Sequence, residues 1–429
     1  MLIRSVALAT IPMTVFDRLV SCLVFMSLAS SGALADTPGS DWTQWRGPRR
    51  DGTVPGPAWP DRLDEQRLQL RWRIPLAESY SGPVVAGDRI FVTETRNEET
   101  EVASAIQRSD GAVLWSQSWP GAMSVPFFAR SNGDWIRSTP AYHDGRLYVA
   151  GMRDTLHCLD AADGGILWKK DFVAEMETPL PAFGCVCSPL VAGDHLFIQA
   201  GAALLKLNQR TGETLWRSMV DEGGMNGSAF SSPYLTTLSG REQLLVQSRT
   251  HLNGVDPDSG AVLWSQEVPA FRGMNIVTPT VLGDSVFTSS YGGRSFLYRI
   301  GGSGAGQFTA SLAWDNKAQG YMCSPVVIDG HAYLHLRNQR FTCIDLTTGE
   351  TRWTTTPYGK YWSLVTQGDR ILALDETGML RLIRATPEKF DLLDERQVSD
   401  QECWAHLAVS GEDVVIRELK GLAVYRWAQ

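Results

Sequence analysis

The sequence predicts an all-β fold, an eight-bladed β-propeller of four-stranded antiparallel blades. Three observations predict it: a repeat that recurs through most of the chain, a composition rich in turn formers and tryptophan, and a lone strand upstream of the first repeat. The 429 residues include 40 Gly, 21 Pro and 15 Trp, with 43% hydrophobic and 20% charged residues. This mixture favours many short strands over long helices, and it excludes disordered, collagen-like and polytopic membrane proteins.

Net charge excludes two further classes of partner. The chain carries a formal charge of −8 at pH 7. Its overall field therefore repels nucleic acid and anionic lipid headgroups, and we expect neither to be a ligand.

The first element, residues 1–35, is predicted to be a secretory signal peptide. Arg18 precedes the apolar run Leu19–Leu28, which is too short to span a bilayer, and Ala33-Leu34-Ala35 fits a cleavage site before Asp36. We expect export to the periplasm or cell envelope, with peripheral attachment there or secretion as alternatives.

Two details of this leader leave alternatives open. Met13 begins a leader of more usual shape than Met1, so we infer that it is the true start. Leu19-Val20-Ser21-Cys22 matches a lipoprotein cleavage pattern, but it precedes the apolar run instead of following it. This order argues against lipidation at Cys22.

The next elements are the copies of a repeat. Each copy begins with Ser-x-Pro or a similar triplet and continues as a strand, a Gly-Asp or Asp-Gly turn, two strands, a second Gly-containing turn and a closing Trp. The dipeptides between apolar runs are hairpin signals, so each unit is predicted to be a four-stranded meander. The clearest copies are Ser138-Thr139-Pro140 to Trp168, Cys187-Ser188-Pro189 to Trp216, Ser232-Pro233 to Trp264, and Cys323-Ser324-Pro325 to Trp353.

The last copies predict how the ring closes. Trp362–Asp394 has no closing Trp, and Ala405–Trp427 ends after a third strand, Leu422–Trp427. Upstream of the first unit, Leu68–Leu76 reads as a lone fourth strand carrying Trp72, which would complete the last blade. From Trp72 onward the units average roughly 45 residues for eight blades, the spacing of propeller repeats. A seven-bladed ring is the structural alternative.

These repeats carry a family resemblance. The tryptophan-docking repeat of the pyrroloquinoline-quinone (PQQ) propeller superfamily resembles two segments in particular, Leu159-Asp160-Ala161-Ala162-Asp163-Gly164-Gly165-Ile166-Leu167-Trp168 and Leu207–Trp216. The resemblance extends over about 350 residues of the predicted propeller, residues 68–429. The resemblance implies that each closing Trp packs between blades, where its N–H can reach a carbonyl. The predicted docking residues are Trp72, Trp115, Trp168, Trp216, Trp264, Trp314 and Trp353. Within the predicted lead-in, residues 36–67, Asp41–Gly52 resembles the segment that precedes exported members; Trp42 and Trp45 would pack across one face, and a partner-binding tail is the alternative.

The resemblance leaves two functional classes. One contains quinoprotein dehydrogenases, which oxidise alcohols or sugars with PQQ, calcium, a catalytic Asp and a ring of adjacent cysteines. The other contains non-catalytic scaffolds, including the propeller lipoprotein of the outer-membrane β-barrel assembly machinery. The mature chain has no adjacent cysteines and no Gly-Thr-Gly-Asn-Pro-like segment. We therefore favour a monomeric scaffold for a protein, peptide or glycan, with no catalytic residue, metal or cofactor; the PQQ- and calcium-dependent dehydrogenase is the alternative.

A candidate binding face follows from the propeller geometry. Residues just before each inner strand converge on one mouth of the channel. A mouth rich in aromatic and hydrogen-bonding groups suits a peptide or a small ring-shaped ligand, and the alternative is that these side chains plug the channel. The candidates are Tyr80, Trp135, Arg137, Cys187, Asn226, Asn275, Tyr321, Cys323, Trp362, Trp404 and His406. Loops Gln117–Trp135 and Glu175–Cys185 would decorate this face with Phe127, Phe128 and Phe183.

The mature cysteines lie at related repeat positions. Cys185-Val186-Cys187 is short for a disulfide, and its spacing alone is weak evidence for a metal. We expect buried free thiols.

Overall fold

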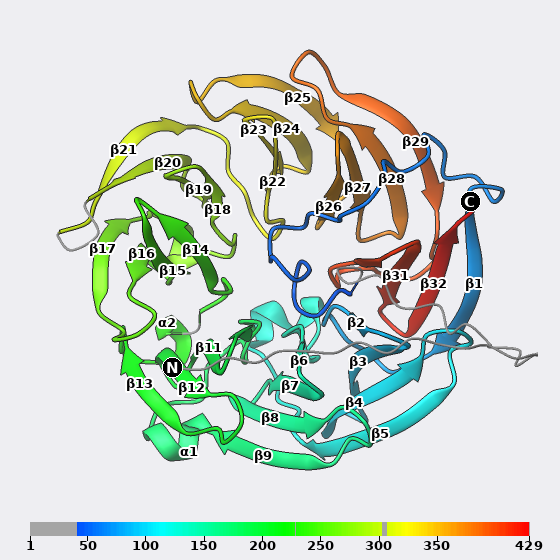
Figure 1. The fold of residues 1–429 in the computed structure, drawn as a ribbon, viewed down its shortest axis with the longest axis vertical. Coiled ribbons are helices and arrows are strands. Elements are labelled where there is room, and N and C mark those ends of the chain that lie inside the picture. Colours follow the sequence, from blue (N-terminus) through cyan, green and yellow to red (C-terminus); the bar gives the residue numbers. More distant parts are fainter. Residues whose placement is uncertain (1–40, 228, 303–306, 429) are drawn as a thin grey trace, which may run out of the picture. The chain divides into compact units, whose positions relative to one another are not determined.

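The computed structural model describes residues 41–428, apart from residue 228 and residues 303–306. The predicted signal peptide, with Met13 and Cys22, lies outside the described residues. The described part contains eight four-stranded antiparallel sheets, and Figure 1 shows them arranged as a ring. This confirms the predicted eight-bladed propeller and excludes seven blades. No helix in the described ranges is long and apolar enough to cross a membrane.

Blades one to four follow the chain from the innermost strand outward. Their strands are β2 (Val84–Ala86), β3 (Arg89–Arg96), β4 (Thr100–Gln107) and β5 (Val113–Pro120); β6 (Ala141–His143), β7 (Arg146–Gly151), β8 (Thr155–Asp160) and β9 (Ile166–Asp171); β10 (Leu190–Ala192), β11 (His195–Ala200), β12 (Ala203–Asn208) and β13 (Thr214–Ser218); and β14 (Tyr234–Leu238), β15 (Arg241–Gln247), β16 (His251–Val255) and β17 (Val262–Glu267).

Blades five to eight repeat this order, and short helices occur only between the earlier blades of the described part. The strands are β18 (Thr280–Leu282), β19 (Ser285–Ser289), β20 (Ser295–Gly301) and β21 (Thr309–Asn316); β22 (Val326–Ile328), β23 (His331–His335), β24 (Arg340–Asp345) and β25 (Thr351–Pro357); β26 (Ser363–Gln367), β27 (Arg370–Leu374), β28 (Met379–Arg384) and β29 (Asp391–Gln397); and β30 (Ala408–Ser410), β31 (Asp413–Glu418) and β32 (Gly421–Trp427). The helices are η1 (Phe127–Asn132), α1 (Phe172–Met176), α2 (Gly224–Gly227) and η2 (Phe271–Gly273).

The ring closes through the predicted exchange of a strand. β1 (Leu68–Pro75) pairs antiparallel with β32, from Leu68 opposite Trp427 to Pro75 opposite Gly421, and is the outermost strand of blade eight. The chain continues from β1 directly into blade one, so this pairing links the last blade to the first. It also covers the outer edge of β32.

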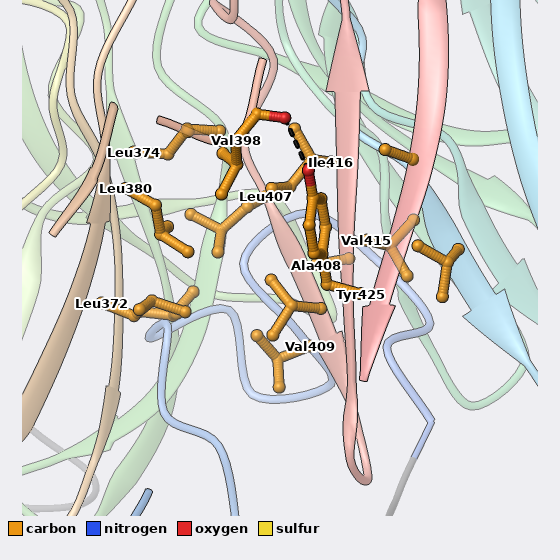
Figure 2. Close-up of a cluster of buried hydrophobic side chains, with 14 of the residues drawn as sticks. Leu372, Leu374, Leu380, Val398, Leu407, Ala408, Val409, Val415, Ile416 and Tyr425 are labelled. Carbon is orange, nitrogen blue, oxygen red and sulfur yellow. Dashed lines mark hydrogen bonds between the residues drawn. The ribbon is translucent and has the colours of Figure 1, made fainter. Parts of the chain in front are cut away.

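Apolar side chains of neighbouring blades fill the space between them. Figure 2 shows one such cluster, in which Leu372 and Leu380 of blade seven face Ile416 and Tyr425 of blade eight. The Tyr425 hydroxyl donates to the Val398 carbonyl at 2.7 Å, so the one polar atom of this ring is satisfied within the cluster.

Six of the seven docking tryptophans donate a hydrogen bond to the next blade. Trp115 donates its indole N–H to the Ala161 carbonyl of blade two at 3.0 Å. Trp72, Trp168, Trp216, Trp314 and Trp353 donate to carbonyls of the following blade in the same way. Trp264 differs, because it donates to the side chain of Gln243 in its own blade.

A shift in strand register directs each indole toward the next blade. In blade one Ala105 pairs with Trp115 but Ile106 pairs with Val113, so one residue of β5 is unpaired just before the tryptophan. A bulge of this kind bends a strand and re-aims the side chain beside it. A glycine of the next blade then receives the ring: a Cβ on Gly164, whose φ is +82°, would lie 2.5 Å from the Trp115 ring.

The hydroxyl residues that directly precede the repeated prolines form a series of hydrogen bonds from blade to blade around the channel. The Thr139 backbone N–H donates to Ser188 Oγ at 3.0 Å, and the Ser188 N–H donates to Ser232 Oγ at 3.0 Å. Ser232 and Thr278 donate onward to Thr278 and Ser324. Each hydroxyl thus accepts from the blade before it and satisfies a buried N–H, which explains the hydroxyl residue at this repeat position.

The lead-in segment enters the central channel instead of lying only across one face. Trp42 pairs with Val85 of β2, and after a loop Thr53 pairs with Thr366 of β26. Both partners lie on inner strands, and in Figure 1 the dark blue segment loops into the middle of the ring. Trp42 is buried, but Trp45 is only partly buried.

Candidate functional site

A cavity of about 820 Å³ opens at the mouth where the inner strands begin. Its wall consists of residues that precede or start these strands. Six of the predicted residues line it: Tyr80, Arg137, Tyr321, Trp362, Trp404 and His406.

The other predicted residues lie elsewhere. Trp135 packs edge-on against Tyr80, with ring centroids 5.3 Å apart, but is not in the cavity lining. Cys187, Cys323 and Asn275 are at most 2% exposed and lie behind the wall. The Asn275 amide donates to the carbonyls of Arg249 and Val268. The side chain of Asn226 lies outside the described part of the structure.

Strand alternation explains which positions reach the cavity. Val186 and Ser188 line it whereas Cys185 and Cys187 do not, and Met322 and Ser324 line it whereas Cys323 does not. Successive side chains in an extended segment point to opposite sides, so the hydroxyl residue directly before each repeated proline fixes the inward register. Applied to the sequence, this rule would have found Met274, Ile276 and Met322, which sequence reasoning missed.

The lead-in supplies the floor of the cavity. Trp45 lines it, and its ring lies 6.0 Å from that of His406. Arg50 donates to the carbonyls of Ser188 and Pro189, and Arg46 donates to the Pro325 carbonyl. These bonds to inner-strand residues on different sides of the ring hold the lead-in loop in the channel.

Aromatic rings continue along one side of the mouth. Tyr80 stacks on Trp404 with centroids 4.7 Å apart, and Trp404 contacts Tyr361 at 4.2 Å. Tyr361 continues to Tyr321 at 5.8 Å, and Tyr321 to Tyr291 at 4.6 Å. Three of these four distances lie within the range of favourable aromatic pairs, and the Trp404–Tyr361 distance is slightly shorter.

Phenylalanines form the other side of the mouth. Phe128 lies 6.2 Å from Phe183, and Phe183 lies 5.7 Å from Phe230, whose ring is 4.9 Å from the Arg249 guanidinium. Phe127 and Phe128 of η1 are 83% and 52% exposed, and Phe271 of η2 is 51% exposed. The phenylalanines of the two predicted decorating loops therefore meet at this rim.

The cavity is cationic. Arg137, Arg249 and Arg272 line it, and among the lining residues that the structure describes there is no aspartate or glutamate. Burial lowers the pKa of His406 to about 3, with a smaller contribution from Arg46, so this imidazole is neutral at pH 7. Burial also lowers the pKa of Arg137.

The thiols near the mouth are unsuited to redox or metal chemistry. The six cysteines in the described ranges are free and buried. Burial raises the pKa of Cys187 to about 11 and that of Cys323 to about 12, so both thiols stay protonated at pH 7. Within the described residues, no three His, Cys, Asp or Glu side chains converge to hold a metal ion.

The lining residues do not fit a calcium-bound quinone. Calcium requires several oxygen ligands, usually with carboxylates among them, and this lining supplies no carboxylate. It also supplies no carboxylate base beside the stacked rings Tyr80 and Trp404. We therefore derive no step through PQQ.

Comparison with known proteins identifies similar chains of two kinds. The outer membrane protein assembly factor BamB of Moranella endobia (strain PCIT) is 21% identical over 354 residues, covering 79% of this chain and 83% of the relative. The polyvinylalcohol dehydrogenase of Sphingopyxis sp. (strain 113P3) is 22% identical over 272 residues, covering 54% of this chain and 40% of that enzyme.

Solved structures share the fold. BamB from Moraxella catarrhalis has a TM-score of 0.61 at 14% identity, covering 84% of this chain and 98% of the solved chain. A europium-containing methanol dehydrogenase has a TM-score of 0.51 at 11% identity, covering 90% and 98%. The family model described as outer membrane protein assembly factor BamB matches residues 98–355, more than half of the chain. The chain therefore belongs to this BamB family of PQQ-like propellers.

Proposed function

We propose that this protein is an exported, non-catalytic scaffold of the cell envelope that holds a partner protein at the aromatic mouth during outer membrane protein assembly. The BamB relatives support this role, because they are outer membrane protein assembly factors. The predicted leader supports export.

The observation that carries the proposal is the exposed apolar rim around a deep cavity. Phe127, Phe128, Met225 and Phe271 are each 47–83% exposed, and all but Phe127 line the cavity of about 820 Å³. A soluble surface seldom leaves large apolar side chains clustered unless they meet a partner.

The rim supplies enough energy for a specific contact. Fully burying a phenylalanine stabilises a complex by about 1.5–3 kcal/mol, so three half-exposed to exposed rings contribute roughly 3–6 kcal/mol before the costs of association. This amount suits a reversible contact that additional interactions strengthen.

A quinone-dependent dehydrogenase is the second candidate, because a polyvinylalcohol dehydrogenase is among the similar chains. We propose that no such cofactor binds, since the lining offers calcium no carboxylate. Calorimetric titration with PQQ plus calcium, followed by a dye-linked assay on alcohols and sugars, tests this directly. Saturable binding with dye reduction would replace the scaffold by the enzyme.

Partner capture from the native envelope tests the scaffold. We would crosslink and recover the protein with the double change Phe128→Ala and Phe271→Ala, which removes two rim rings. The matched control is Val262→Ala with Leu312→Ala, two side chains that are 47% and 52% exposed on outer strands β17 and β21, away from the mouth. Capture should fall with the rim variant at unchanged melting temperature and persist in the control. The reverse pattern would contradict the mouth as the docking site.

A further inference from the structure

The charge of the mouth is opposite to the charge of the chain. The protein as a whole carries −8, with 47 acidic and 39 basic residues. The cavity lining nevertheless contains three arginines, Arg137, Arg249 and Arg272, and no acidic residue. A concave site lined by one sign of charge concentrates ligands of the other sign.

The carboxylates nearest to this site are held in other contacts. Asp134 accepts the Val125 N–H at 3.1 Å, and Asp221 accepts the Gly223 N–H at 2.7 Å. Glu402 is near enough to help raise the pKa of Tyr80, a shift caused mainly by burial, but it does not line the cavity. Asp134 and Asp221 also interact electrostatically with Arg137 and Arg249, but neither carboxylate lines the cavity, so the charged side chains that face it directly are the arginines.

Two further arginines lie beside the floor residue Trp45, although they line a neighbouring cavity and not the mouth itself. The guanidinium carbons of Arg46 and Arg50 lie 5.6 and 5.7 Å from the centroid of the Trp45 ring. Both arginines are at most 2% exposed and are held by backbone carbonyls; Asp51, the acid nearest in the sequence, pairs with Arg49 and also acts electrostatically on Arg46. Burial lowers the pKa of Arg50 to about 10, so it remains charged at pH 7.

We propose that the mouth cavity binds an acidic segment of the partner protein in which carboxylates alternate with aromatic side chains. The aromatic side chains would stack on Tyr80, Trp404 and the rim phenylalanines, and the carboxylates would pair with Arg137 and Arg272. This inference rests on the proposed function, because it names the chemistry of the partner at the same mouth.

The size of the cavity limits the occupant to a short stretch of chain. Its volume of about 820 Å³ is within the range of pockets that enclose a drug-sized ligand. A folded domain cannot enter such a space, whereas a few residues in an extended conformation can. Charge-assisted pairs with arginine add both affinity and direction to stacking contacts.

Four labelled octapeptides separate charge from stacking. The probes are (Glu-Phe)₄, (Gln-Phe)₄, (Glu-Ala)₄ and (Lys-Phe)₄, each titrated with the full-length mature protein and followed by fluorescence anisotropy. We expect (Glu-Phe)₄ to bind at least about fivefold more tightly than (Gln-Phe)₄, and both other probes to bind more weakly still. The preference for (Glu-Phe)₄ should shrink between 50 and 500 mM salt, as expected for partly exposed charges.

Two variants and a control connect the effect to the lining arginines. Arg272→Gln and Arg137→Gln should each weaken (Glu-Phe)₄ binding several-fold and leave (Gln-Phe)₄ unchanged. Arg272 is exposed, so its replacement carries little risk of unfolding. The control Arg130→Gln removes an exposed arginine of η1 that does not line the cavity, and it should change neither probe.

The outcomes distinguish this inference from the proposed function. Equal binding of (Glu-Phe)₄ and (Gln-Phe)₄, tighter binding of (Lys-Phe)₄, or an equal effect of Arg130→Gln would overturn the acidic partner. Partner capture sensitive to the rim phenylalanines would still stand in those cases. Absence of binding by all four probes overturns the acidic segment as occupant, and loss of rim-dependent capture overturns the scaffold itself.

Discussion

Trp115 and Gly164 offer a direct test of how blades hold together. Trp115 is 9% exposed, donates to the Ala161 carbonyl and lies against Gly164. Replacing it by Ala removes a ring that buries roughly 150–250 Å², and it leaves a cavity that the rigid blades cannot collapse. We expect Trp115→Ala to lower the free energy of unfolding by about 4 kcal/mol, and the exposed neighbour Leu114→Ala by less than about 0.5 kcal/mol.

Gly164→Ala should lower the same free energy through two separable effects. A φ of +82° costs an alanine about 1 kcal/mol, and its Cβ would lie 2.5 Å from the Trp115 ring, so the ring must move at a further cost of about 1–3 kcal/mol. In the Trp115→Ala background only the first cost remains. The double variant should therefore be more stable than the sum of the single changes by about 1–3 kcal/mol.

Denaturant unfolding followed by far-ultraviolet circular dichroism measures all four proteins without relying on tryptophan fluorescence. The comparison requires equal denaturant slopes, because a changed slope would signal a different unfolded state or a lost two-state transition. If the losses in unfolding free energy of the two single variants add up to that of the double variant within about 0.5 kcal/mol, direct contact between Gly164 and the Trp115 indole does not explain why the two residues occur together in the repeat.

Three further predictions concern the channel, the pH dependence and the thiols. Trp45→Ala should remove the floor and weaken (Glu-Phe)₄ binding in the anisotropy titration while the blades stay folded by circular dichroism. His335 is buried and its pKa is lowered to about 4, so the unfolded chain takes up the proton first as the pH falls, and His335 alone should lower the stability by about 2 kcal/mol between about pH 6.5 and pH 5. His157 and His406, whose pKa values burial lowers to about 4 and about 3, act in the same direction, so unfolding curves of His335→Gln should show a decline that is smaller by about 2 kcal/mol but not abolished. The six cysteines of the described part should react with a thiol reagent only after unfolding, because they are buried, and rapid reaction of the native protein would contradict that packing.

The blades could be predicted from the sequence because their signals are local and repeated. Hairpin dipeptides, Ser/Thr-Pro pairs and closing tryptophans recur in unit after unit, and the orphan strand Leu68–Pro75 follows from counting strands. The inward register at the mouth was harder to predict. Cys187 and Cys323 precede inner strands as expected, but successive side chains point to opposite sides, and these two lie behind the cavity wall. The hydrogen-bonded hydroxyl residues show which alternate positions face the channel.

The floor of the cavity could not be predicted from local patterns. Trp45, Arg46 and Arg50 reach the channel because the lead-in pairs with β2 at one end and with β26 at the other. These contacts join residues up to about 300 positions apart, as Arg46 and Pro325 show with a separation of 279. No periodicity within residues 36–67 specifies such partners, since the acceptors are backbone carbonyls that every sequence provides.

The course of the lead-in also fixes which way the mouth points when the protein is tethered. The Asp41 carboxylate accepts the Gly87 N–H in the turn between β2 and β3, and Trp427 donates its backbone N–H to Glu412, near the turn between β30 and β31. Both ends of the propeller therefore emerge on the face of these turns, opposite the mouth. A tag, fusion partner or surface attached at either end would leave the mouth unobstructed and directed away from the support, which makes end-on immobilisation the natural geometry for presenting it to a second protein.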